Sequence, residues 1–234
     1  MNVCLGAKLG QGAEVLVYEH KTDPGLVVKI PRDRPDLETV LAERLAGERC
    51  LHQAGLSGHV LETLTAVPGF ANGRRYAFVE TQTRIQTTLF DDVGDLLRAG
   101  QIDLSLKAVQ RFFDFERSVL WASGVVMRDC GSFLKNVAVH EGKLKLLDFS
   151  SMSCAPLALE RMILSGKAGR RIQCALKKFK SLVDAHEMGA LWSEFHGGLW
   201  RIAENHYRLD LELWTEQAFS LGEGKFVTRE GSWH

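Results

Sequence analysis

Two aspartates and one asparagine between residues 125 and 150 are of the types that phosphoryl transfer uses. Asp129 follows an arginine, Asn136 comes seven residues later, and Asp148 precedes a phenylalanine. One carboxylate can orient or deprotonate an attacking hydroxyl, and an asparagine with a second carboxylate suits Mg²⁺ on nucleotide phosphates. The order predicts Asp129 as the catalytic residue and Asn136 and Asp148 as Mg²⁺ ligands.

A glycine-rich stretch near the N-terminus is predicted to bind the phosphates. It lies between two expected strands, which argues against a dinucleotide-binding fingerprint, and it lacks a GK[ST] ending, which argues against a Walker loop. Glycine lets the backbone approach phosphate oxygens, and backbone N–H groups there can bind an anion. The predicted nucleotide-binding residues are Gly10, Gln11, Gly12 and Ala13. A plain β-turn is the alternative.

Lys29 lies in an expected strand, residues 26–30, among β-branched residues. A charged side chain in that setting needs an anionic partner or a route to solvent. We predict that Lys29 positions the nucleotide phosphates. A lysine that points from an edge strand into water is the alternative.

The helix expected over residues 36–54 offers two acidic partners for Lys29. Its apolar stripe is formed by Leu37, Leu41 and Leu45. At about 100° per residue, Glu48 falls within this stripe, whereas Glu43 faces away from it. A carboxylate on an apolar stripe is costly unless it is paired. Glu48 is therefore the predicted partner of Lys29.

The elements that must position these residues divide the chain into two parts, residues 1–82 and 83–234. The first part is strand-rich, with strands expected near 15–18, 26–30, 60–67 and 76–81, a turn over 68–74 and the helix 36–54. The second part is mainly helical, with helices expected over 90–98 and 104–121 and after 156, and two short strands around 140–142. The predicted fold class is α+β with two lobes.

Together these motifs resemble the protein-kinase-like superfamily over roughly residues 9–152. The GQGAEVLVY stretch is similar to the phosphate loop of small Bud32-like atypical kinases, a group that also includes the RIO and YrbL types. The RD…N…DF order resembles the catalytic and metal-binding segments of this superfamily. The resemblance implies a bilobal kinase-like fold, with a β-rich N-lobe and a reduced helical C-lobe. It also implies that the protein binds ATP and Mg²⁺ and transfers the γ-phosphoryl group to a hydroxyl. A protein Ser/Thr is ranked before a small molecule as the acceptor. Glu80 is added to the predicted nucleotide-binding residues.

Some residues depart from the pattern of that superfamily. Met127 stands where a histidine is usual, Ser150 replaces a glycine, and Gly131 replaces a phosphate-contacting lysine for which Lys135 is a candidate substitute. These departures keep a second hypothesis open, a pseudokinase that binds nucleotide and serves as an interaction or scaffold module. A third hypothesis is a nucleic-acid-associated ATPase.

Composition narrows the function classes. The formal net charge of zero argues against electrostatic binding of nucleic acid or membrane by the whole protein. The five cysteines are scattered, which favours reduced thiols.

No apolar run approaches the ~20 residues of a membrane span and no signal peptide is recognised, so a cytoplasmic protein is expected. The basic region 161–180 is either a solvated surface or a docking surface for an acidic or nucleic-acid partner.

Overall fold

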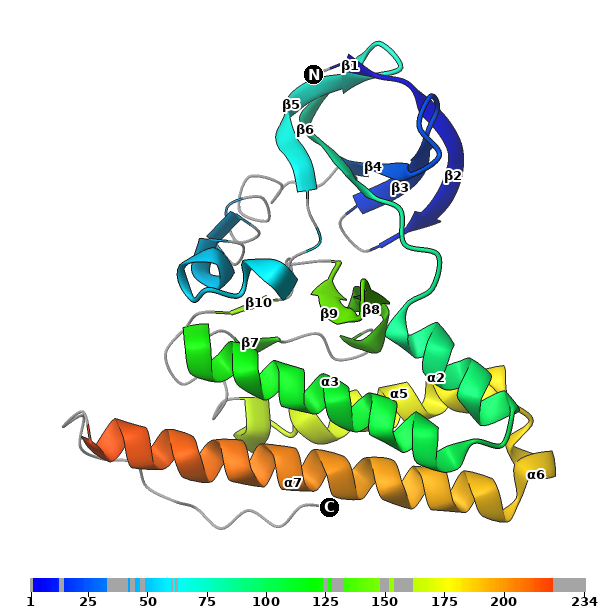
Figure 1. The fold of residues 1–234 in the computed structure, drawn as a ribbon, viewed down its shortest axis with the longest axis vertical. Helices are drawn as coiled ribbons and strands as arrows, with labels where there is room; N and C mark the ends of the chain where they lie inside the picture. Colours follow the sequence, from blue (N-terminus) through cyan, green and yellow to red (C-terminus); the bar gives the residue numbers. More distant parts are fainter. Residues whose placement is uncertain are drawn as a thin grey trace.

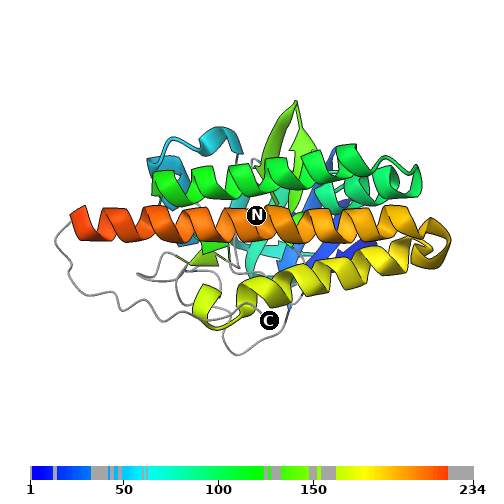
Figure 2. The same ribbon diagram turned by 90° about the horizontal axis from the view of Figure 1, so that it is seen from below.

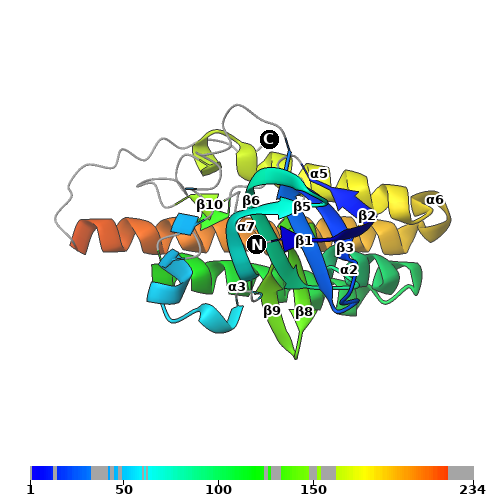
Figure 3. The same cartoon turned by 90° about the horizontal axis from the view of Figure 1, so that it is seen from above.

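The computed structural model shows an α+β fold, as predicted, with strands at one end and helices at the other (Figure 1). The residues that it describes are 2–12, 15–32, 42, 45–46, 49–59, 61, 63–123, 126–127, 133–147, 152–153 and 162–220. The six-stranded sheet lies over the helical part (Figure 3).

The large sheet has the strand order β1-β5-β6-β4-β3-β2. Its strands are β1 (Asn2–Val3), β2 (Leu5–Gln11), β3 (Val15–His20), β4 (Leu26–Pro31), β5 (Thr63–Ala71) and β6 (Arg74–Thr83). All neighbours pair antiparallel except β1 and β5, which are parallel. The strands predicted at 15–18 and 26–30 are confirmed, and β4 and β6 lie in the middle of the sheet.

The turn predicted over residues 68–74 was too long. β5 continues through Pro68 to Ala71, and only Asn72 and Gly73 form the turn, both with positive φ, 48° and 79°. An Asn-Gly pair is a strong signal for a two-residue hairpin turn of this kind. The proline is accommodated because the β5–β6 register shifts between Val67 and Gly69, and such irregularities tolerate a residue without a backbone N–H.

Two small sheets lie between the large sheet and the helices. β8 (Val137–His140) and β9 (Lys143–Leu146) form the hairpin predicted around residues 140–142. β7 (Val126–Met127) pairs antiparallel with β10 (Met152–Ser153). The short 3₁₀ helices are η1 (Ser57–His59) and η2 (Phe133–Asn136).

The helical part confirms the predicted helices over 90–98 and 104–121. Its helices are α2 (Leu89–Arg98), α3 (Ile102–Ser123), α5 (Lys167–Leu182), α6 (Ala185–Met188) and α7 (Ala190–Ser220). α2 begins at a capping box, in which Thr88 and Asp91 each bond the other's backbone N–H through their side chains. α7 runs along the underside of the molecule between α3 and α5 (Figure 2).

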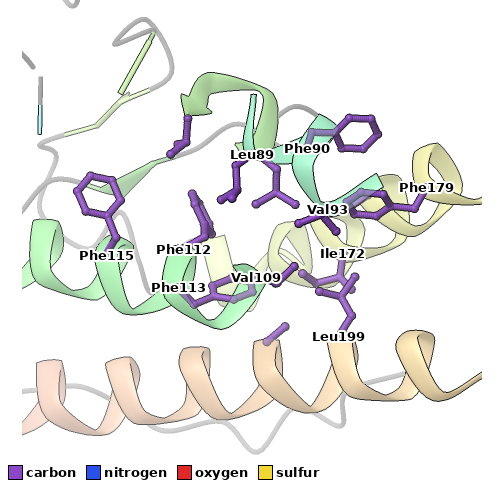
Figure 4. Packing of buried hydrophobic residues seen from close by; sticks show 14 of the residues in the cluster. Leu89, Phe90, Val93, Val109, Phe112, Phe113, Phe115, Ile172, Phe179 and Leu199 are labelled. Carbon is purple, nitrogen blue, oxygen red and sulfur yellow. The ribbon is translucent and has the colours of Figure 1, made fainter. Parts of the chain in front are cut away.

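Each end of the molecule has its own buried hydrophobic cluster. The smaller cluster lies in the sheet and consists of Val3, Val28, Ile30, Ala71 and Val79. The larger cluster joins α2, α3, α5 and α7, and Phe90 stacks on Phe179 with 4.5 Å between ring centroids (Figure 4). Gly198 lets α7 approach α3 closely, since an added Cβ there would lie 2.5 Å from Cδ1 of Leu106.

The helix predicted over 36–54 is helical at its described positions up to residue 53, and Gly55 follows with φ of 75°. The predicted apolar stripe does not define its buried face, however, because Leu45 is 36% exposed while Leu51 is fully buried. Leu51 joins the hydrophobic cluster of the helical part. Glu43 and Glu48 lie outside the described residues, so the choice of Glu48 over Glu43 stays a prediction.

The helical part also buries a group of charged and polar side chains, here called the Arg171 cluster: Glu116, Arg171, His206 and Tyr207. Arg171 Nη1 donates to Glu116 Oε1 at 2.7 Å and to the Tyr207 hydroxyl at 2.9 Å, and His206 Nε2 lies 3.2 Å from Glu116 Oε2. Burial alone would raise the pKa of Glu116, but the Arg171 charge and the His206 hydrogen bond outweigh burial and lower it. The cluster thus connects α3, α5 and α7 through an ion pair.

Candidate functional site

Lys29 lies in β4 and points away from solvent, with 7% of its surface exposed. Its Nζ donates to the backbone carbonyl of Leu147 at 2.7 Å and lies 3.9 Å from Glu80 Oε1. The alternative of an edge-strand lysine in water is therefore wrong, because β4 is a central strand and the ammonium group is nearly buried. Lys29 links the sheet to the residue that precedes Asp148.

Glu80 and Gln82 share the face of the sheet on which Lys29 lies. Glu80 is opposite Lys29 in the β4–β6 register, and Gln82 is two residues further along β6, so both side chains project from one face. Gln82 Nε2 lies 3.5 Å from the same Leu147 carbonyl. Lys29, Glu80, Gln82 and the Leu147 carbonyl are here called the Lys29 cluster.

Asn136 meets the same segment through the backbone. Its carbonyl accepts a hydrogen bond from the Leu147 N–H at 2.8 Å, just where β8 begins and β9 has ended. On the far side of both predicted catalytic segments, Met127 pairs with Met152. The segments 128–132 and 148–151 therefore lie between two backbone contacts. On one side Leu147 bonds Asn136, and on the other side Met127 pairs with Met152.

The glycine-rich stretch lies partly within a strand. Gly10 and Gln11 pair with Val17 and Leu16, and Gly12 donates its N–H to the Val15 carbonyl at 2.8 Å. Neither Gly10 nor Gly12 has a positive φ, and a Cβ added at Gly10 would meet no described atom within 4 Å. The fold itself does not require glycine at Gly10.

Four predicted site residues, Ala13, Glu48, Asp129 and Asp148, lie outside the described residues. The structure thus brings together Lys29, Glu80 and the backbone of Asn136, while the Mg²⁺ ligands and the catalytic aspartate stay predictions. Lys135 contacts a different region, because its ammonium group lies 4.7 Å from the Phe90 ring centroid on α2.

Sequence reasoning missed Gln82 and the Leu147 carbonyl. The strand period gives the only signal for Gln82, since residues two apart on a strand share a face with the already selected Glu80. A backbone carbonyl carries no residue-type signal. The contact of Lys29 with Leu147 follows from how the two parts of the molecule pack.

Other features of the described residues point elsewhere. They contain no group of three or more His, Cys, Asp or Glu side chains that could hold a metal. A hollow of about 400 Å³ lies between the α2–α3 turn and the start of α7, and none of the predicted site residues lines it. In the described part of the chain, no helix combines the length and the apolar character needed to cross a membrane.

Comparison with known proteins adds no assignment: no protein-family model and no curated protein matches this chain.

Proposed function

We propose that the chain is an ATP- and Mg²⁺-dependent phosphotransferase of the protein-kinase-like type, which transfers the γ-phosphoryl group to a hydroxyl. The observation that carries the proposal is the Lys29 contact with Leu147, 2.7 Å from Nζ to the carbonyl oxygen. It sets a strand lysine beside the segment that leads into Asp148. Phosphoryl transfer by this chemistry needs little more than positioned phosphates and stabilised charge.

The arrangement of the sheet supports the same proposal. The glycine-rich stretch joins β2 and β3, and Lys29 lies on the next strand, β4. A glycine loop over the phosphates with a lysine on the third strand is how protein kinases hold ATP. Gly10 has no positive φ, and no described atom lies within 4 Å of a Cβ added there, so among the described residues there is room for a ligand beside Gly10.

In this proposal each predicted residue has one role. Asp129 orients or deprotonates the acceptor hydroxyl, Asn136 and Asp148 hold Mg²⁺, and Lys29 with the glycine-rich stretch positions the phosphates. Mg²⁺ would neutralise charge on the phosphate oxygens.

The acceptor in this proposal is a protein Ser/Thr hydroxyl, delivered by an acidic protein that docks on α5. The exposed basic residues of α5 are Lys167, Arg170, Lys177 and Lys180, and this helix contains no Asp or Glu. The formal net charge of zero makes nucleic acid the weaker choice of partner. Binding of an acidic peptide that weakens with salt supports this surface, whereas preferential binding of single-stranded RNA contradicts it.

The test is a comparison of the wild type with Asp129→Ala and Asp148→Ala. Calorimetry with ATP, with and without Mg²⁺, measures binding, and γ-labelled ATP incubated with cell extract or with the protein alone measures transfer. We expect Mg²⁺-dependent binding and transfer in the wild type. Asp129→Ala should keep binding and lose transfer, and Asp148→Ala should lose the Mg²⁺ dependence. A wild type that neither binds Mg²⁺-ATP nor transfers label overturns the proposal.

A pseudokinase is the second candidate function. The observation that favours it is that the Lys29 ammonium already contacts two protein acceptors, Glu80 and the Leu147 carbonyl. Mg²⁺-ATP binding by the wild type without transfer to any protein in the extract would select this candidate.

A further inference from the structure

We infer that Glu80 is a positioning residue that holds Lys29 from within the sheet, independently of the helix over 36–54. The inference rests on the proposed function, because an oriented Lys29 matters for activity only if it meets nucleotide phosphates. It adds a glutamate on a strand to the helical glutamate predicted as the partner of Lys29.

The strand pairing fixes where the Glu80 carboxylate lies. Lys29 and Glu80 are opposite each other in register, and β4 and β6 each have a strand on both sides. Backbone hydrogen bonds on both edges hold such strands rigidly. The sheet therefore sets the spacing of the Lys29 and Glu80 backbones, and this spacing does not depend on the position of any helix.

Burial makes the two side chains depend on each other. Glu80 is 0% exposed and Lys29 is 7% exposed, so both charged side chains are removed from water on their face of the sheet. Their strand neighbours Val28, Ile30 and Val79 project to the opposite face, where they belong to the buried apolar cluster of the sheet. A charge at this depth is costly unless it has an opposite charge nearby. The Glu80 carboxylate therefore offsets the charge of Lys29 and restrains the direction of its side chain.

The distances show how Lys29 can serve two acceptors. Nζ is 2.7 Å from the Leu147 carbonyl and 3.9 Å from Glu80 Oε1, so the direct hydrogen bond goes to Leu147 and the carboxylate acts as a nearby charge. A nucleotide phosphate, which carries more charge than a carbonyl, would replace Leu147 as the acceptor. Glu80 would keep its place while the acceptor changes.

This arrangement predicts which glutamate matters for the nucleotide. A lysine held by a helix loses its orientation when the helix moves, whereas a lysine held by a central strand keeps it. Removing the Glu80 charge should thus weaken phosphate binding more than removing the Glu48 charge. Binding of the nucleoside, which Lys29 is not expected to contact, should be unaffected.

The experiment measures the affinity of Mg²⁺-ATP and of adenosine by calorimetry. The variants are Glu80→Gln, Glu80→Asp and Glu48→Gln, and the matched control is Glu19→Gln on β3, which removes a carboxylate whose partner is Arg84 at 3.1 Å. We expect Glu80→Gln to weaken Mg²⁺-ATP binding at least about tenfold, as for loss of a charge-assisted contact. Adenosine binding should change by less than about twofold, which is under 0.5 kcal/mol. Glu80→Asp should lie between, and the effects of Glu48→Gln and Glu19→Gln should be smaller than that of Glu80→Gln.

Each result decides the inference. A wild type that binds Mg²⁺-ATP and a folded Glu80→Gln that binds it equally well overturn the inference and leave the proposed function standing. Equal weakening of ATP and adenosine, or a larger effect of Glu48→Gln, also overturns it. A wild type that binds no Mg²⁺-ATP overturns the inference and the proposed function together. If Glu80→Gln does not fold, Glu80→Asp decides, and unchanged Mg²⁺-ATP binding by that variant overturns the inference.

Discussion

The molecule buries charge in two places, and the two clusters differ in where their partners come from. In the Arg171 cluster, Arg171 donates at 2.7 Å to Glu116 from another helix of the same hydrophobic core. In the Lys29 cluster, Lys29 reaches out of its own sheet to the Leu147 carbonyl of the β8–β9 segment. Burial of a charge alone therefore does not mark a functional site.

The difference lies in which part of the molecule uses the contact. Arg171 is fully buried and lies over the Phe112 ring at 5.5 Å, so its charge is held within packed helices. Burial alone would lower the pKa of Arg171, but the Glu116 carboxylate outweighs burial and raises it. Lys29 connects the large sheet to Leu147, beside the predicted metal ligands. We expect the first cluster to control folding and the second to control ligand binding.

The largest effect on stability is expected from Arg171→Met. This change leaves Glu116 buried without its cation, which costs about 3–5 kcal/mol of unfolding free energy. Urea denaturation followed by circular dichroism measures it. The matched control is the double variant Arg171→Met with Glu116→Leu, which removes both charges and should recover part of the loss. A loss under about 1 kcal/mol in Arg171→Met would be typical of an exposed pair and would contradict a structural role.

Lys29→Met should affect Mg²⁺-ATP binding more than it affects stability. We expect a stability loss of about 1–3 kcal/mol, because Glu80 stays buried without its nearby cation and one hydrogen bond is lost, but the ion-pair distance of 3.9 Å is longer than that of Arg171. Stabilisation of the protein by Mg²⁺-ATP in a thermal shift assay should disappear. If Lys29→Met costs as much stability as Arg171→Met and still binds Mg²⁺-ATP, the contrast between the clusters is wrong.

Acid should weaken the Arg171 cluster only below the ordinary pKa of a glutamate. The pKa of Glu116 is lowered in the folded protein from its ordinary value of 4.5, so its contribution is complete above pH 4.5 and is lost as the pH falls through the folded value. One carboxyl contributes at most about 1.4 kcal/mol per pH unit. Unfolding free energies between about pH 3 and 6 should fall less steeply for the Arg171→Met and Glu116→Leu double variant than for the wild type. Equal slopes would show that Glu116 is not responsible.

Much of this fold followed from the sequence. A run of β-branched residues between turn residues predicted β4, the turn at 140–142 predicted the β8–β9 hairpin, and the helical character after residue 83 predicted α2 and α3. The predicted stripe did not include Leu51, which packs into the core of the helical part, because the covered side of a helix depends on segments that are distant in the sequence. The sequence also placed Lys29 and Asn136 in the site. It could not show which acceptor Lys29 meets, because a backbone carbonyl has no residue type and the contact depends on the packing of distant segments.

The smallest expected effects come from two glycines, of which one should affect stability and the other ligand binding. Gly73 has a φ of 79°, where a Cβ is strained, so Gly73→Ala should cost about 1 kcal/mol of stability and leave Mg²⁺-ATP binding unchanged. Gly10 has neither a positive φ nor a described atom within 4 Å of an added Cβ, so Gly10→Ala should leave stability unchanged. It should still weaken Mg²⁺-ATP binding, because the added methyl group keeps the phosphates from the backbone. Urea denaturation and calorimetry on both variants provide the measurement. A Gly10→Ala variant with normal ATP affinity would show that the glycine-rich stretch is a plain β-turn, and would leave Lys29 as the only support for phosphate binding from the sheet.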